Sequence, residues 1–315
     1  MCADGPVDAK TGEPLIDPAT GERYEGANDD LASDIHNYLV KLRSNKSNGG
    51  ETISRFGVLG LLSMSTPIYC YDHPALKERC NTAFTDGISV FVDADFMRKL
   101  VNQEEDSDGK EFGVLWLMLH ELMHKLSLHI TRMRNMDPVI ANIAQDLVIN
   151  GKLIKGFPEL KPVALLRDIG QGVNEQSAEK YYNMSEEVVA EMLILKKRQD
   201  EAKKKQQSGQ GEGDGQGSSQ TSGQKQQSGS GSKGQGTKGG GAGDVDDIDL
   251  SGDGEYGDRH HMTPEELISI LEEEGLMDTV GEALGYPPSS DVEKLGKIKE
   301  KAVFDTVDAV QTAMA

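Results

Sequence analysis

The chain has 315 residues, and its 53 acidic side chains outnumber its 33 basic ones, which gives a formal net charge of −20. Such a charge repels phosphate backbones unless basic residues gather on one surface, and no basic run is longer than the three residues 203–205, so we expect no nucleic-acid binding. The three cysteines, Cys2, Cys70 and Cys80, lack the spacing of a disulfide framework or a thiolate zinc site. The apolar runs are far shorter than the roughly 20 residues that cross a bilayer, so no membrane-spanning segment is expected.

The composition changes along the chain and predicts four segments. Residues 1–28 are rich in Gly, Pro and acidic side chains, without apolar periodicity, and are expected to be disordered. Residues 29–204 carry the apolar patterns of a folded domain. Residues 205–262 are a linker, first rich in Gly, Ser and Gln and then acidic, that buries too little apolar surface to fold. Residues 263–315 show amphipathic helical patterns in a tail too short for a strong core of its own, so we expect it to dock on the domain or to bind a partner.

Apolar periodicity and turn residues predict the elements of the domain in chain order. Asp86-Gly87 lies between two β-rich runs and is typical of a two-residue hairpin turn. Asp137 is the expected N-cap of a helix with Pro138 at its first position, and Gly151 is its expected end. Helices are predicted at 29–44, 56–64, 112–130, 138–150 and 185–205.

Residues 120–124 read His-Glu-Leu-Met-His, an H-E-x-x-H motif within the most apolar of these helices. Histidines four apart lie one turn apart on one helical face, so both imidazoles can reach one Zn²⁺, and Glu121 is placed as general base. The same motif can also arise from two surface histidines on an amphipathic helix. In so apolar a helix, however, two histidines and a carboxylate would be buried, and burying them costs free energy unless they are paired or bound to a metal. The motif therefore predicts a metal site at His120 and His124, with a metal-free polar cluster as the alternative.

A catalytic zinc site needs a third protein ligand. His129 is rejected for this role, because an unbroken helix would place it about 13 Å beyond His120 along the axis and on the opposite face. Asp146 is the better candidate, because it forms a polar stripe with Asn142 and Asn150 on an otherwise apolar helix. We expect the two asparagines to orient the ligands. The alternative is an ordinary buried aspartate bonded to backbone amides.

The run from 120 to 150 resembles a known family. It reads H-E-x-x-H-x4-H-x2-R, then Asp-Pro, Asn-Ile-Ala and Asp-Leu-Val-Ile-Asn. This pattern is similar to the predicted metallopeptidase domain that precedes a von Willebrand factor A-like module in bacteria and phages. Residues 85–96 and 177–182 match further elements of that family, so the resemblance covers roughly 29–200.

The resemblance implies a mainly helical, zincin-like α+β domain with a small β-hairpin or sheet. It also implies that His120 and His124 bind Zn²⁺, that Glu121 is the catalytic base and that Asp146 is the third ligand. In zincins a strand beside the metal helix binds the substrate backbone by edge pairing, and residues 88–92 are similar in position. The D-x-S-x-S metal site of the family's usual C-terminal module is missing from this sequence, which would fit a shortened, phage-encoded member.

The sequence favours a zinc-dependent peptidase that hydrolyses peptide bonds in protein or peptide substrates. The alternative is a catalytically silent, metal-stabilised scaffold that recruits a partner, such as an ATPase, through linker and tail; Glu121 argues against it, because a structural site needs no base. The group that stabilises the oxyanion stays open among Tyr181, Tyr182 and His129. The N-terminus lacks the basic and apolar regions of a secretory signal, so we expect a cytoplasmic protein, in the host cytoplasm if phage-encoded.

Overall fold

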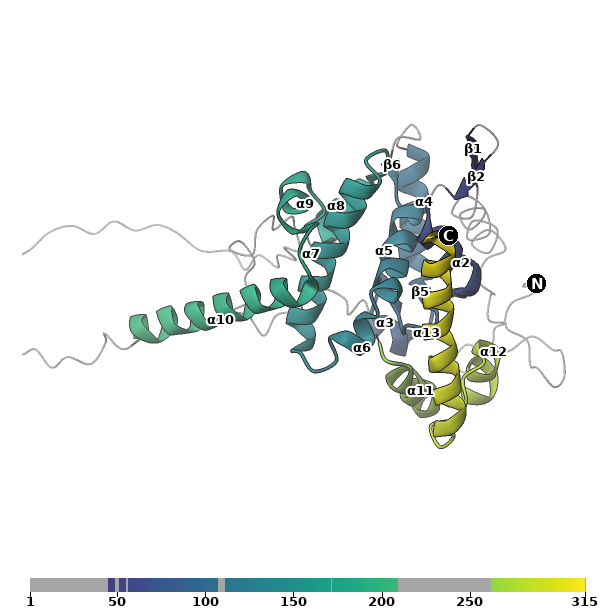
Figure 1. Ribbon diagram of the computed structural model, residues 1–315. Coiled ribbons are helices and arrows are strands. Elements are labelled where there is room, and N and C mark those ends of the chain that lie inside the picture. The colour runs from purple at the N-terminus through teal and green to yellow at the C-terminus, as the bar shows by residue number, and fades with distance from the viewer. Residues whose placement is uncertain are drawn as a thin grey trace, which may run out of the picture.

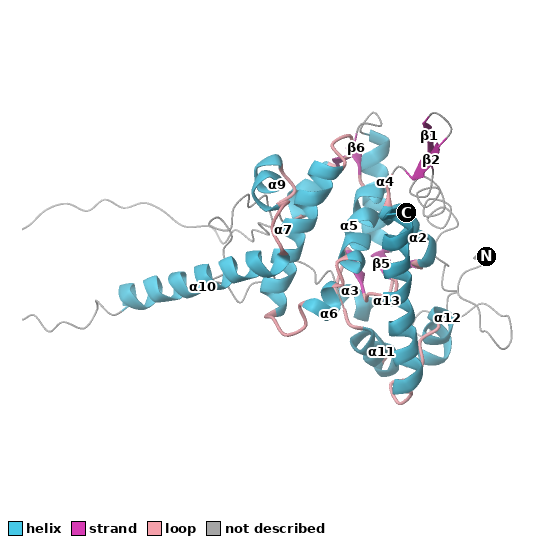
Figure 2. Cartoon of the chain, in the orientation of Figure 1, coloured by secondary structure: helices cyan, strands magenta, loops and turns pink. Residues whose placement is uncertain are grey.

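The computed structural model describes residues 45–48, 51–54, 56–106, 111–170, 172–208 and 262–314. The segments predicted as disordered (1–28) and as a helix (29–44), and the linker from 209 to 261, lie outside the described residues. The described chain is mainly helical with a small three-stranded sheet, which confirms the predicted fold class (Figures 1 and 2). Within the described residues, every helix is too short or too polar to cross a bilayer.

The three-stranded sheet has the order β3 (Ile68–Tyr71), β5 (Val90–Asp93) and β4 (Ala83–Thr85). β5 runs parallel to β3 and antiparallel to β4, which confirms the predicted hairpin. The predicted two-residue turn is wrong, however, because Thr85 pairs with Val90 and leaves a four-residue loop. Two short pairs complete the strands: β1 (Asn45–Asn48) with β2 (Glu51–Ser54), and β6 (Glu111–Phe112) with β7 (Lys161–Pro162).

The helix that carries the H-E-x-x-H motif is α5 (Val114–Leu126). It contacts β4, α2 (Val58–Ser65), α4 (Ala94–Asp106) and α7 (Pro138–Gly156), and it forms the centre of the main hydrophobic core. Two short helices, α3 (Pro74–Arg79) and α8 (Ala164–Ile169), lie before β4 and after β7. Because α5 packs on several sides, its polar side chains face groups of the protein more than solvent.

The motif helix ends earlier than its apolar pattern predicts. The pattern continues to residue 130, but α5 ends at Leu126, and Leu128 adopts the left-handed conformation with φ 52° and ψ 39°. That conformation costs about 1–2 kcal/mol for a residue with a Cβ and normally favours glycine. A new short helix, α6 (His129–Arg132), then starts in a different direction.

The next long helix begins as predicted and ends later. The Asp137 side chain accepts hydrogen bonds from the backbone of Val139 and Ile140, which confirms the N-cap. Gly151 does not end the helix, which continues to Gly156. A Cβ at Gly151 would lie 3.1 Å from the backbone nitrogen of Tyr182, so glycine serves close packing here. The polypeptide that packs there follows α9 (Glu175–Tyr181) and leads into α10 (Glu186–Ser208), which projects from the body (Figure 1).

The C-terminal tail docks on the domain. It contains α11 (Pro264–Glu273), a π-helical turn (Met277–Gly281), α12 (Glu282–Leu284) and α13 (Val292–Met314). Thr263 and Glu266 form the predicted capping box of α11. α13 packs along α2 (Figure 1), and a second hydrophobic cluster joins Phe84 and Phe91 of the sheet to Leu267, Leu271 and Tyr286 of the tail. The expected docking is therefore confirmed.

Candidate metal centre

Packing of α5 against α7 brings three predicted ligands together. The Nε2 atoms of His120 and His124 lie 3.0 Å apart. Oδ1 of Asp146 lies 3.5 Å from the first and 3.4 Å from the second. All three residues are buried, and their ligand atoms lie within 4.8 Å of one another. Among the described residues, this is the group of His, Cys, Asp and Glu whose spacing suits a metal ion.

The three separations fit a tetrahedral zinc ion. Bonds of about 2.0–2.1 Å at tetrahedral angles place ligand atoms about 3.3 Å from one another. The separations of 3.0, 3.4 and 3.5 Å lie around that value. Two imidazoles and one carboxylate are also a donor set typical of catalytic zinc, which leaves a fourth position for water or substrate.

Each imidazole is held by a second contact at its other nitrogen. Nδ1 of His120 lies 3.0 Å from Oδ1 of Asn150, as expected for an asparagine that orients a ligand. An amide oxygen only accepts hydrogen bonds, so Nδ1 of His120 carries the proton and its Nε2 presents a lone pair towards Asp146. Nδ1 of His124 lies 2.9 Å from Nδ1 of His129.

The prediction that one unbroken helix runs from His120 through His129 is wrong. An unbroken helix would have carried His129 away, but the left-handed Leu128 turns the chain so that His129 packs against His124. The two rings meet edge-on, with centroids 5.0 Å apart and planes at 78°. His129 contacts the nitrogen of His124 that does not face Asp146, and its own Nε2 lies 3.4 Å from Oε1 of Glu186. His129 therefore contacts the side of His124 that faces away from Asp146, and it is not one of the three grouped ligands.

Burial favours the neutral forms of His124 and His129. It lowers the pKa of His124 well below the usual value, although Asp146 acts in the opposite direction. It also lowers the pKa of His129, while Glu186 acts in the opposite direction. A neutral imidazole is the form that binds metal. Glu121 is completely buried on the same helix, next to His120.

The strand predicted to bind substrate is not at an edge. β5 is the central strand, and Phe91 pairs with Tyr69 on one side and Phe84 on the other. Both sides of β5 are therefore used within the sheet, and the predicted edge pairing at residues 88–92 is wrong. β4 is the outer strand next to α5. The backbone oxygen of Thr85 at its end accepts a hydrogen bond of 3.1 Å from the backbone nitrogen of Met262 in the tail.

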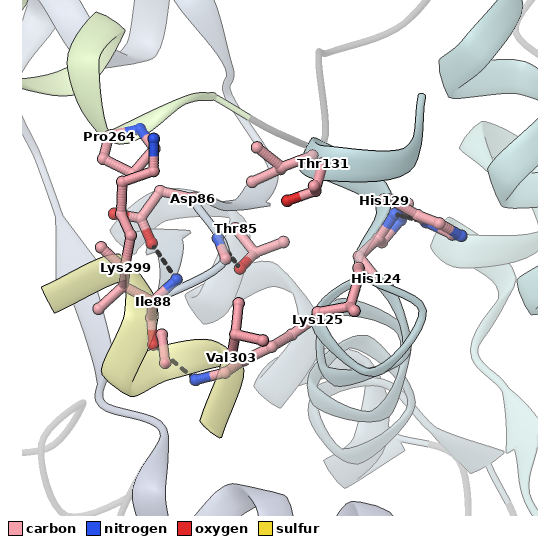
Figure 3. Close-up of a pocket in the computed structure, with 14 residues that line it drawn as sticks. Thr85, Asp86, Ile88, His124, Lys125, His129, Thr131, Pro264, Lys299 and Val303 are labelled. Carbon is pink, nitrogen blue, oxygen red and sulfur yellow. Dashed lines mark hydrogen bonds between the residues drawn. The ribbon is translucent and has the colours of Figure 1, made fainter. Parts of the chain in front are cut away.

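A small pocket lies beside the candidate metal centre, between the hairpin loop, the end of α5 and the tail (Figure 3). Lys125 extends across it, and its Nζ donates a hydrogen bond of 2.8 Å to the backbone oxygen of Ile88. Burial lowers the pKa of Lys125 to about 8. Lys299 and Val303 of α13 form the opposite wall, so the tail closes one side of this pocket.

Tyr181 and Tyr182, the two tyrosines considered as oxyanion stabilisers, contact groups other than the predicted ligands. Tyr181 is fully buried in the hydrophobic cluster between α7 and α10. Tyr182 follows it, with the Lys155 ammonium 6.0 Å from the centre of its ring. Neither contact involves the predicted ligands.

Sequence reasoning missed Glu186. It lies at the start of α10, where an acidic residue looks like an ordinary favourable charge in the first helical turn. Its burial and its contact with His129 follow from the packing of α10 on α7, which no local pattern encodes. The sequence signal that pointed in this direction was the apolar run at residues 188–195 of α10, which predicts that the first half of this helix packs on the domain.

No curated protein and no solved structure matches the chain. A family described as "Putative metallopeptidase domain" matches residues 64–273. That range contains the three predicted ligands, Glu121 and the whole of α5 and α7, and it reaches the end of α11. Because the match covers more than half of the sequence, the chain belongs to this metallopeptidase domain family.

Proposed function

We propose that this protein is a zinc-dependent peptidase, with His120, His124 and Asp146 as its metal ligands and Glu121 as its general base. The observation that carries the proposal is the convergence of two imidazole nitrogens and one carboxylate oxygen at distances that suit a tetrahedral ion. Membership of a metallopeptidase domain family supports the same reaction class. We assign this activity to a domain over residues 29–204, with 263–315 as its docked tail.

A zinc ion held by His120, His124 and Asp146 would supply Lewis acidity, which would lower the pKa of a water molecule and polarise the scissile carbonyl group. Asn150 holds the ring of His120 so that its Nε2 faces the ligand group. Glu121 accepts the proton of the attacking water and returns it to the nitrogen of the leaving amine as the peptide bond breaks. Glu121 is completely buried on the helix that carries both candidate histidine ligands, so its carboxylate lies away from bulk solvent.

Metal content and cleavage, measured on the same full-length samples, test the proposal. Wild type should contain one zinc per chain by elemental analysis and should cleave members of a peptide library. Glu121→Gln keeps the shape of the side chain and removes the base, so zinc should stay while cleavage falls by about 10²–10⁴-fold. If zinc-loaded wild type leaves every peptide intact, the peptidase proposal is wrong, and the alternative of a catalytically silent scaffold is favoured.

A second experiment tests whether Asp146 is one of the metal ligands. Asp146→Ala should lose zinc, because two histidines alone bind it weakly. Glu179→Ala, a substitution of a carboxylate paired with Lys155 on the surface, serves as the control and should retain zinc. Full zinc content in Asp146→Ala would remove Asp146 from the ligand set.

A further inference from the structure

We propose that His129 and Glu186 form a hydrogen-bonded relay that positions His124 as a metal ligand. The proposal rests on the metal site proposed above. In this relay the Nδ1 hydrogen of His124 is donated to Nδ1 of His129. Nε2 of His129, with its hydrogen, lies in polar contact with the carboxylate of Glu186, 3.4 Å from Oε1. His129 and Glu186 are positioning residues, because neither faces the ligand group.

The order of the protons follows from the geometry. A ligand nitrogen needs a lone pair, so if Nε2 of His124 faces the metal, its single hydrogen is on Nδ1. That hydrogen points to Nδ1 of His129 at 2.9 Å, which must then be the acceptor. A neutral His129 consequently carries its hydrogen on Nε2, which is the nitrogen that lies 3.4 Å from Oε1 of Glu186. Each proton position fixes the next.

The relay ends at a carboxylate that stays charged. Although the Glu186 side chain is only 2% exposed, Lys152 Nζ lies 3.0 Å from Oε1 and Arg132 Nη2 lies 3.1 Å from Oε2. Burial acts to raise the pKa of Glu186, but the contact with His129 and the hydrogen bond from Lys152 outweigh it and hold the pKa well below its usual value. A carboxylate that is ionised at neutral pH keeps the Nε2 hydrogen of His129 in place.

The relay also gives a reason for the strained turn after α5. Only a sharp change of direction at Leu128 lets His129 return to His124 instead of continuing along the helix axis. The partners come from three helices: His124 from α5, His129 from α6 and Glu186 from α10. The fold accepts an unfavourable backbone conformation where it brings these side chains together.

Zinc affinity of the full-length protein, measured by competition with a chromophoric chelator, tests the relay independently of cleavage. His129→Leu removes the acceptor and should weaken zinc binding by about 10–100-fold. His129→Asn places an amide oxygen where Nδ1 stood, so it can accept the same hydrogen bond and should recover most of the affinity. The visible spectrum of the cobalt-substituted protein should change in His129→Leu and stay close to that of wild type in His129→Asn.

A matched pair of substitutions distinguishes a loss of zinc affinity caused by the relay from one caused by a general loss of stability. Glu186→Gln should weaken zinc binding, because its neutral amide is a poorer acceptor. Glu187→Gln is the control: it removes the neighbouring carboxylate, which pairs with Arg132 on the surface, and should leave the affinity unchanged. Thermal melting of the metal-free proteins shows whether each variant is folded.

The relay is overturned if His129→Leu and His129→Asn bind zinc equally well, or if Glu186→Gln and Glu187→Gln do. A wild-type protein that binds no zinc overturns both the relay and the proposed site. Zinc binding that depends on His129 and Glu186 in a protein that cleaves no peptide supports the relay and overturns the peptidase. The two proposals therefore fail in different experiments.

Discussion

The Tyr286 hydroxyl donates a hydrogen bond to the buried carboxylate of Asp86, 200 residues earlier in the sequence. Asp86 lies in the β4–β5 loop, where its Oδ1 also accepts hydrogen bonds from the backbone of Ile88 and Ser89. One carboxylate thus shapes the hairpin loop and anchors the C-terminal tail. The tail is thereby fixed next to the candidate metal centre.

Tyr286→Phe should lower the free energy of unfolding by about 1.5–3 kcal/mol, the usual contribution of a hydrogen bond to a charged group. Burial raises the pKa of Asp86, and the loss of the tyrosine hydroxyl removes a group that stabilises its charged form. Urea unfolding measures the change. Tyr182→Phe, at a half-buried tyrosine beside Lys155, is the control and should change stability by less than about 0.5 kcal/mol.

The same substitution should loosen the tail. Amide hydrogens of α11 should exchange faster in Tyr286→Phe, because the tail loses one of its hydrogen bonds to the hairpin loop. Those of α7, which packs on α5 and α10, should keep their rates. Equal exchange of α11 in the two proteins would show that the hydrophobic cluster alone holds the tail.

Leu128 should tolerate glycine better than valine. Its φ of 52° and ψ of 39° suit glycine, whereas a β-branched side chain is a strong outlier in that region. We expect Leu128→Gly to keep the stability of wild type within about 1 kcal/mol, since relieved strain offsets lost packing. Leu128→Val should lose about 1–3 kcal/mol. Thermal melts of the metal-free proteins compare them, and equal loss in both would mean that packing of Leu128 dominates.

Asn150 should contribute to zinc affinity through His120. Asn150→Leu removes the acceptor at Nδ1 and should weaken binding by about 10–100-fold in chelator competition. Asn150→Asp retains an acceptor oxygen, so this variant should bind zinc clearly more tightly than Asn150→Leu. Identical affinities for wild type and Asn150→Leu would show that the ring of His120 is oriented by packing alone.

Glu186 should make the metal-free protein sensitive to acid. Its folded-state pKa is lowered, so its ionised form stabilises the fold above the unfolded pKa of about 4.3, and this contribution is lost as the pH falls below that value. Wild type should therefore exceed Glu186→Gln in stability at pH 7, and the gap should narrow towards about pH 3. Urea unfolding in the presence of a chelator at the two pH values measures it. A gap independent of pH would mean that the charge of Glu186 does not stabilise the fold.

Local patterns in the sequence were sufficient for much of the fold. The apolar run of α5, the Asp137 cap and the capping box at Thr263 act within one or two helical turns, so they can be read from neighbouring residues. The end of α5 could not be predicted in this way. Apolar residues continue past Leu126, and the left-handed turn at Leu128 accompanies the packing of His129 against His124, a contact that the apolar pattern does not encode.

The sequence by itself determined which residues can carry the chemistry. The spacing of His120 and His124 fixes them on one helical face, and the polar stripe of α7 singles out Asp146 because an apolar helix has few other polar positions. Only the tertiary structure decided how these groups are supported. Glu186 and Tyr286 act through contacts made after helices distant in sequence have packed, and such contacts depend on the arrangement of whole elements, which no local periodicity records.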